Sequence, residues 1–273
     1  MRFSFLLAYN MFVATFVIKY NIREFWRLEP AKVKYTYKDV YWRDLWLIPI
    51  VIVSLFLILN TSVIVASLFN IPFSNQLTVN LSVISQCLAY CVGFLGFYLL
   101  HYRGFFKKIK FYSQRAAKHW KRIIIVFVLM ITSISLYTQL ISLLPESLQF
   151  QETENQKTIE SLFNVPAMIP ILFTMIVIAG PIMEEMFFRY FLIGQLGKVF
   201  TFPVMSVISV LTFAAIHTTH AQSPFEYGLY LLLSIGMVYI YLKTGRNIMA
   251  AIALHIINNF VSFIMSLIAI GFS

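Results

Sequence analysis

Residues 165–197 read VPAMIPILFTMIVIAGPIMEEMFFRYFLIGQLG, and this apolar run decides the fold class. It exceeds the ~20 residues that a helix needs to cross ~30 Å of hydrocarbon. Similar runs recur along the 273-residue chain, which is 60% hydrophobic and only 12% charged. The runs are continuous rather than alternating, which disfavours a β-barrel. We therefore expect an all-α fold, a polytopic integral membrane helical bundle.

Eight segments are apolar enough to be membrane spans. They lie at about residues 3–19, 45–70, 80–101, 123–144, 165–197, 201–217, 227–242 and 248–270. The first is short and contains Tyr9 and Asn10, so it suits either a span or the membrane interface. It resembles a signal peptide in outline, but no small-residue cleavage site follows. The pattern predicts seven or eight transmembrane helices in a single membrane domain of residues 1–273.

The formal net charge of +10 is interpreted as basic loops that face the cytoplasm, with no nucleic acid as a partner. Lys and Arg concentrate in residues 20–44 and 102–122, which should lie inside. The first of these stretches should rest on anionic lipid heads, with docking of a substrate or partner as the alternative. Residues 145–164 carry four Glu against one Lys and should lie outside. Cys87 and Cys91 lie four residues apart in an apolar helix, a poor geometry for a disulfide.

Three charges stand inside the 165–197 run. Of the chain's 11 acidic residues, only Glu184 and Glu185 lie within an apolar run, and Arg189 is the only basic residue well inside one. A charge at the bilayer centre costs about 2.5–3.5 kcal/mol on insertion scales. On a helix, Glu185 and Arg189 can pair on one face, while Glu184 points ~100° away and is free for general acid or base chemistry. A buried salt bridge without chemistry is the alternative.

Two further polar pairs follow on later spans. Phe213 and His217 lie four residues apart, as do His255 and Asn259. A lone histidine in an apolar helix is usually a hydrogen-bonded core residue. Histidines, carboxylates and an asparagine on three spans together indicate a site.

The depths of these residues in the membrane can be compared by helical rise. Glu184 lies ~22 Å before the turn that joins its span to the next, and His217 lies ~24 Å after it. His255 lies only ~12 Å beyond residues 243–247, on the same side. The three depths agree if the fifth run, ~50 Å long as a helix, projects beyond the bilayer. Gly180-Pro181 is a candidate helix break just before the carboxylates.

With these motifs the chain resembles the CAAX-protease and bacteriocin-processing (CPBP, Abi) family of intramembrane proteases, in its prokaryotic type. The matching patterns are EExxxR, FxxxH and HxxxN, in that order, within about residues 165–262. That core covers about a third of the chain. Tyr190 departs from the family, because many members have Gly after the Arg.

The resemblance implies peptide-bond hydrolysis within or beside the membrane. The residues it assigns as catalytic are Glu184, Glu185, Arg189, His217, His255 and Asn259. By analogy, Glu184 with His217 would activate the attacking water, and His255 with Asn259 would stabilise the oxyanion. The remaining two residues would support the site.

A metal is left open by this pattern. If one is present, its ligands would be Glu184, His217 and His255, a set that suits Zn²⁺ with an open position. The family is commonly described as a metalloprotease, but the chain has no HExxH motif. A glutamate-activated water needs no metal, and our interpretation slightly favours that mechanism.

The expected substrate partner is a membrane-associated peptide or protein, such as a lipidated tail, a leader or a signalling peptide. In a bacterial cell membrane this would serve bacteriocin processing, self-immunity or peptide maturation. The alternative is a non-catalytic scaffold or regulator on the same fold, with a membrane protein partner such as a sensor kinase or cell-wall enzyme. A proton-coupled transporter ranks last, because no two-fold repeat is evident.

Four other residues are interpreted as structural or solvated. His101 and His119 lie among basic residues and should be solvated, and His220 should cap a loop. Glu226 begins a span, where a carboxylate suits a helix N-terminus.

Overall fold

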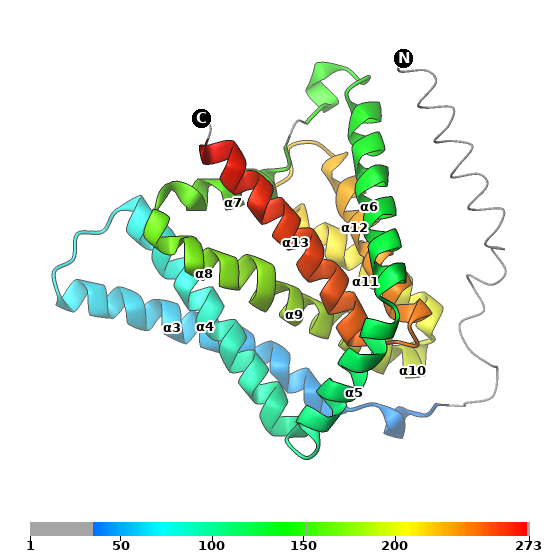
Figure 1. Cartoon of the computed structure of the whole chain (residues 1–273). Coiled ribbons are helices and arrows are strands. Elements are labelled where there is room, and N and C mark those ends of the chain that lie inside the picture. The colour runs from blue at the N-terminus through cyan, green and yellow to red at the C-terminus, as the bar shows by residue number, and fades with distance from the viewer. Residues whose placement is uncertain (1–34, 151, 272–273) are drawn as a thin grey trace. The chain divides into compact units, whose positions relative to one another are not determined.

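The computed structural model describes residues 35–150 and 152–271. Residues 36–273 form one compact unit. In its described residues this unit is helical and contains no strand, so the expected all-α membrane fold is confirmed (Figure 1). The predicted span 3–19 and most of the basic stretch 20–44 lie outside the described residues.

Short helical turns, η1 and η2, precede the long helices. Their bounds are Tyr37–Asp39 and Trp42–Trp46. The first helices are α3 (Leu47–Leu68), α4 (Asn75–His101), α5 (Phe105–Lys118), α6 (Trp120–Ile141) and α7 (Glu154–Ser161). The fifth predicted span is a composite of α8 (Ile169–Phe173), η6 (Thr174–Ala179), α9 (Gly180–Glu185), η7 (Met186–Leu196) and α10 (Gly197–Phe200). The last helices are α11 (Phe202–His217), α12 (Glu226–Lys243) and α13 (Ile248–Gly271).

Five of these helices are long and apolar enough to cross a membrane. They are Trp42–Leu68, Asn75–His101, Trp120–Ile141, Pro166–Phe200 and Ile248–Ala269. The apolar α11 is shorter, and α12 has a glutamate and a lysine at its ends. Each of the predicted spans from 45–70 onward thus corresponds to a helix.

The composite helix does not break at Pro181, so that expectation was wrong. Its two π-helical stretches, η6 and η7, flank α9. The Gly180 N–H reaches back to the Met175 carbonyl, five residues earlier, which widens the turn before the proline ring. A Cβ at position 180 would lie 2.8 Å from the Met175 oxygen, so only glycine lets this turn close.

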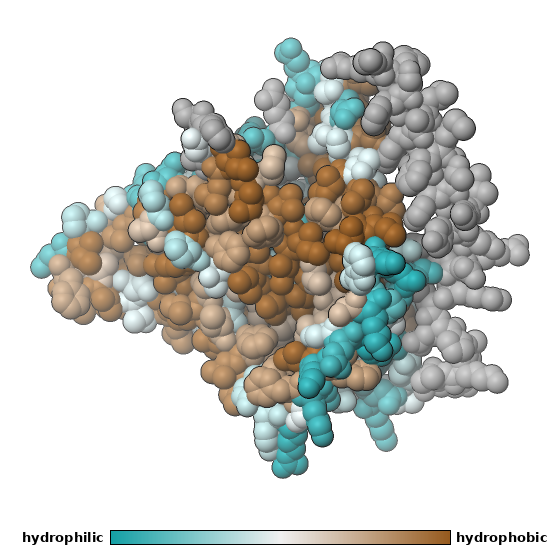
Figure 2. All heavy atoms as spheres, viewed as in Figure 1, coloured by the Kyte–Doolittle hydropathy of each residue, from teal (hydrophilic) through white to brown (hydrophobic). Residues whose placement is uncertain are grey.

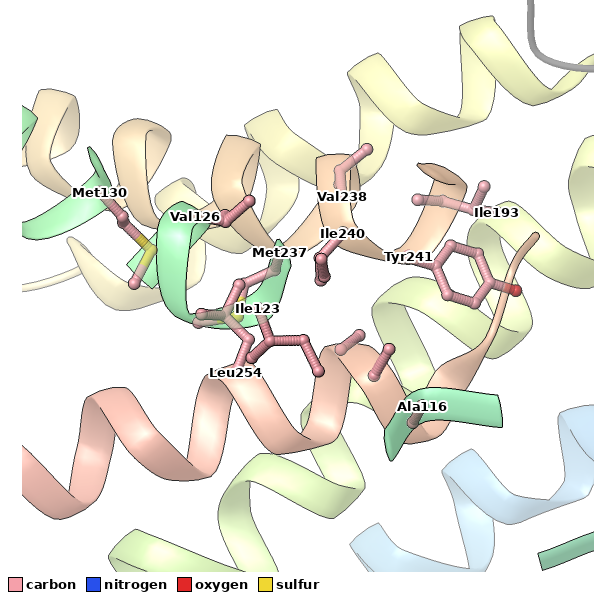
Figure 3. Close-up of a cluster of buried hydrophobic side chains, with 12 residues drawn as sticks. Ala116, Ile123, Val126, Met130, Ile193, Met237, Val238, Ile240, Tyr241 and Leu254 are labelled. Carbon is pink, nitrogen blue, oxygen red and sulfur yellow. The ribbon is translucent and has the colours of Figure 1, made fainter. Parts of the chain in front are cut away.

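α6, α12, α13 and η7 enclose one hydrophobic core (Figure 3). Met237 and Ile240 of α12 and Leu254 of α13 are almost fully buried there. Ala250 and Ala251 of α13 are fully buried, and such small residues let membrane helices approach closely. This packing holds α13 against the composite helix.

α13 also connects the basic and acidic ends of the unit. At its start, Asn247 Nδ2 donates to the Tyr112 carbonyl of α5 at 2.9 Å, and near its end Gln156 Nε2 of α7 donates to Ser266 Oγ at 2.8 Å. The contacts of the basic α5 and of the acidic segment around α7 are therefore ~28 Å apart along α13. Figure 2 shows hydrophilic side chains along α5 beside a largely hydrophobic face.

Candidate active site

Three helices bring Glu184, His217 and His255 together. Glu184 lies on α9, His217 is the last residue of α11, and His255 lies in the second turn of α13. Glu184 Oε2 lies 3.7 Å from His217 Nε2 and 3.6 Å from His255 Nε2. The agreement of depths expected from the helical rise is thus observed.

The FxxxH motif orients His217. Its Nδ1 lies 2.8 Å from the Phe213 carbonyl oxygen, and a carbonyl only accepts, so Nδ1 carries the proton. Nε2 is then the atom that faces Glu184. The imidazole is stacked between Phe213 and Tyr230, with ring centroids 4.2 and 5.0 Å away.

Glu185 orients His255 in a corresponding way. Its Oε1 accepts from His255 Nδ1 at 2.8 Å, so Nε2 again faces Glu184. A carboxylate in this position selects one tautomer of the ring and fixes its orientation. The two adjacent glutamates therefore have different surroundings, since Glu185 is fully buried and the side chain of Glu184 is 26% exposed.

Arg189 pairs with Glu185 as the spacing predicts. Its Nη1 lies 3.0 Å from Glu185 Oε1, and both side chains are fully buried. Nη2 donates to Ser234 Oγ of α12 at 3.1 Å, and the guanidinium lies 4.9 Å from the Phe213 ring centroid.

Asn259 joins α13 to the composite helix through one of its two amide hydrogens. Its Nδ2 donates to the Ile176 carbonyl of η6 at 2.9 Å, and its Oδ1 accepts from Asn258 Nδ2 at 3.1 Å. The physical reason lies in the π turn. The Ile176 carbonyl would receive the N–H of residue 181, but proline has none. Asn259 satisfies this carbonyl from α13.

We expect Asn259→Ala to lower the free energy of unfolding by about 1–3 kcal/mol, because the Ile176 carbonyl would lose its donor. Pro181→Ala would restore a backbone N–H, so the double variant should lose less stability than the sum of the two single variants. Thermal unfolding in detergent of all four proteins measures this coupling. Strictly additive losses would contradict the assignment.

The site contains histidine and glutamate, the residue types that bind zinc, and the next question is whether their arrangement suits a metal ion. Among residues 35–150 and 152–271 no three His, Cys, Asp or Glu side chains are placed to hold a metal ion.

A mostly apolar pocket of about 220 Å³ opens beside Glu184, between α3, α4, the composite helix and α11. Its apolar wall includes Val51, Ile52, Met183, Phe187 and Ile216. Glu184 Oε2 is buried toward the histidines and has no hydrogen-bond partner in the described part of the chain. An extended apolar ligand in the pocket would thus lie against the catalytic candidate.

Sequence reasoning missed a buried cluster at the end of this pocket. Asp44 Oδ2 accepts from Tyr190 OH at 2.7 Å, and Asp44 Oδ1 lies 2.9 Å from His101 Nε2. The expectation that His101 is solvated was wrong, because its side chain is only 9% exposed. Tyr190, the departure from the family pattern, thereby ties the start of α3 to the composite helix. The sequence did contain a signal for this cluster, because the Asp44 carboxylate directly precedes an apolar span.

Glu226 has the structural role that its position suggested. Its Oε1 accepts from the Gln222 N–H at 3.0 Å, and its Oε2 accepts from the Glu154 N–H, at the start of α7, at 2.9 Å. It lies 1% exposed and takes no part in the site.

Comparison with known proteins supports the same region. The family model described as "Type II CAAX prenyl endopeptidase Rce1-like" matches residues 166–261, which contain all three motifs. Searches of curated proteins and of solved structures found no match. Over this segment, which carries the three motifs that meet in the structure, the chain is similar to the CAAX endopeptidases of membranes.

Proposed function

We propose that the protein is an intramembrane endopeptidase in which Glu184 activates water to hydrolyse a peptide bond. The observation that carries this proposal is the convergence of two imidazole Nε2 atoms on one carboxylate oxygen at 3.6 and 3.7 Å. Each ring has its Nδ1 committed to an acceptor, so both Nε2 atoms are available to the reaction.

In the first step, a water held by Glu184 Oε2 and His217 Nε2 attacks the carbonyl carbon of the scissile bond. The water gives one proton to the carboxylate as the new C–O bond forms, and the carbonyl electrons move to oxygen. Both separations are longer than a direct hydrogen bond, so Glu184 Oε2 and the imidazole nitrogens can each turn to a water beside them.

In the second step, the tetrahedral intermediate collapses. His255, protonated at Nε2, donates to the oxyanion while Glu185 stabilises the imidazolium charge. The electrons return from oxygen, the C–N bond breaks, and the proton held by Glu184 passes to the leaving nitrogen. The products are an amine and a carboxylic acid, which keeps the second proton of the water until it ionises. The low dielectric of the site strengthens each electrostatic contribution.

The substrate class in this proposal is a membrane-associated peptide: a lipidated tail, a leader or a signalling peptide. The apolar pocket beside Glu184 and the membrane-length helices support it. We place the enzyme in a bacterial cell membrane, in bacteriocin processing, self-immunity or peptide maturation. A substrate that is itself a membrane protein would reach the site from within the bilayer.

The test is complementation of a gene deletion, read by membrane peptidomics. A peptide that accumulates in the deletion strain should disappear when wild type or His220→Ala is restored, and should persist with His217→Ala at matched abundance. His220 is the matched control because it is exposed and lies three residues away. Full complementation by His217→Ala would overturn the proposal and favour a scaffold or regulator.

We also expect the purified protein to keep its activity after incubation with EDTA or phenanthroline and dialysis. The reason is that the proposed base is a carboxylate that takes a proton from water without a Lewis acid. Hydrolysis of the accumulating peptide is the measurement. Loss of activity that returns on adding Zn²⁺ would contradict the expectation and assign Glu184, His217 and His255 as ligands.

A further inference from the structure

We propose that Tyr90 of α4 is a further catalytic residue, whose hydroxyl donates a hydrogen bond to the carbonyl oxygen of the scissile bond. This inference rests on the proposed function. It starts from the pocket, where Tyr90 and Glu184 line the same cavity from facing helices. α4 packs directly against η6 and α9, so Tyr90 and Glu184 lie on helices that contact each other.

The polar side chains that line the pocket can be compared one by one. Asp44 only accepts, and both of its oxygens are engaged, by Tyr190 and by His101. The Tyr190 hydroxyl hydrogen is committed to Asp44. Glu184 is an acceptor when ionised.

Tyr90 is different. Its oxygen accepts from Gln86 Nε2 at 2.9 Å, which fixes the phenol and leaves its own hydrogen to donate. No acceptor for that hydrogen is found among the described residues. Of the pocket-lining polar side chains, Tyr90 is thus the one with a donor hydrogen to spare.

The reaction needs such a donor. A tetrahedral intermediate concentrates negative charge on one oxygen, and two preorganised donors commonly hold it. His255 Nε2 can supply one of them, and one of the two Asn259 Nδ2 hydrogens is engaged by the Ile176 carbonyl. A phenol that lines the pocket with Glu184 would be the second donor, beside the imidazolium of His255.

The same geometry orients the substrate. An apolar side chain next to the scissile bond would pack against Met183, Phe187 and Ile216, which places the peptide carbonyl between Glu184 and Tyr90. Glu184 then approaches the carbon while Tyr90 approaches the oxygen. Tyr90 also contributes a ring face to the apolar wall.

The experiment compares wild type with Tyr90→Phe and with the control Tyr98→Phe, using the peptide that accumulates in the deletion strain. Tyr98 lies two turns further along α4, where its ring packs on Phe105. We expect Tyr90→Phe to lower kcat about 100-fold with little change in KM, as loss of one oxyanion donor does. Tyr98→Phe should match wild type. Binding of a peptide aldehyde, which forms the tetrahedral oxyanion, should weaken in Tyr90→Phe, whereas binding of an uncleaved amide analogue should not.

Two results separate this inference from the proposed function. If Glu184→Gln is inactive and Tyr90→Phe has wild-type kcat and aldehyde affinity, the role of Tyr90 is overturned and the proposed function stands. If Glu184→Gln is as active as wild type, the proposed function itself fails. If Tyr90→Phe reduces the abundance of the protein, 3-fluorotyrosine introduced at position 90 keeps both the ring and the hydroxyl. A kcat at or above that of wild type then supports the inference, and a loss of kcat contradicts it.

Discussion

Arg189→Met is expected to destabilise the protein more than any other single change in the site. The variant would leave the fully buried Glu185 carboxylate without its cation, and breaking a buried pair in this way costs about 3–5 kcal/mol. It would also remove the donor to Ser234 Oγ, which links the composite helix to α12. We expect a large fall in the unfolding temperature in detergent and in the abundance of folded protein in membranes.

The reciprocal change tests the cause. Glu185→Leu combined with Arg189→Met removes both charges and leaves apolar side chains of similar size, which is often nearly neutral for stability. The double variant should therefore be much more stable than Arg189→Met alone. It should nevertheless be inactive, because His255 Nδ1 would lose the carboxylate that orients its ring. Equal instability of the single and double variants would show that the charge pair is not the source of the effect.

Glu184→Gln is expected to abolish hydrolysis, with a loss of about 10³-fold or more, while the protein remains folded. A glutamine amide cannot take the proton from water, and general base catalysis commonly contributes about 10²–10⁴-fold. Stability should be unchanged or slightly higher. Glu184 Oε2 has no hydrogen-bond partner among the described residues, so removing its charge breaks no bond of the fold.

Two measurements on the same membranes check this expectation: the rate of peptide hydrolysis and the unfolding temperature. Glu146→Gln provides the control, since Glu146 is an exposed glutamate in the acidic segment before α7. It should keep full activity. Hydrolysis at the wild-type rate by Glu184→Gln would remove the carboxylate from the mechanism, and a large loss of stability would assign it to the fold.

The sequence by itself determined the membrane fold class and the ion pair between Glu185 and Arg189 on one helix. Continuous apolar runs predict spans because a helix satisfies its own backbone hydrogen bonds in lipid, and this depends only on local sequence. The Glu185–Arg189 pair is local for the same reason, since residues four apart share a helix face. The meeting of Glu184 with His217 could also be anticipated, because one short turn joins their helices.

Only the tertiary structure decided how the remaining polar groups are used. Asn259 lies 83 residues from the Ile176 carbonyl that it satisfies, and Asp44 lies 146 residues from Tyr190. No periodicity relates such positions, because the packing of separate helices brings them together. The same packing places Tyr90 beside Glu184 and turns the Nε2 atoms of both histidines toward one carboxylate oxygen. The motifs determined which residues are present, and helix packing decided which atoms of those residues are free to react.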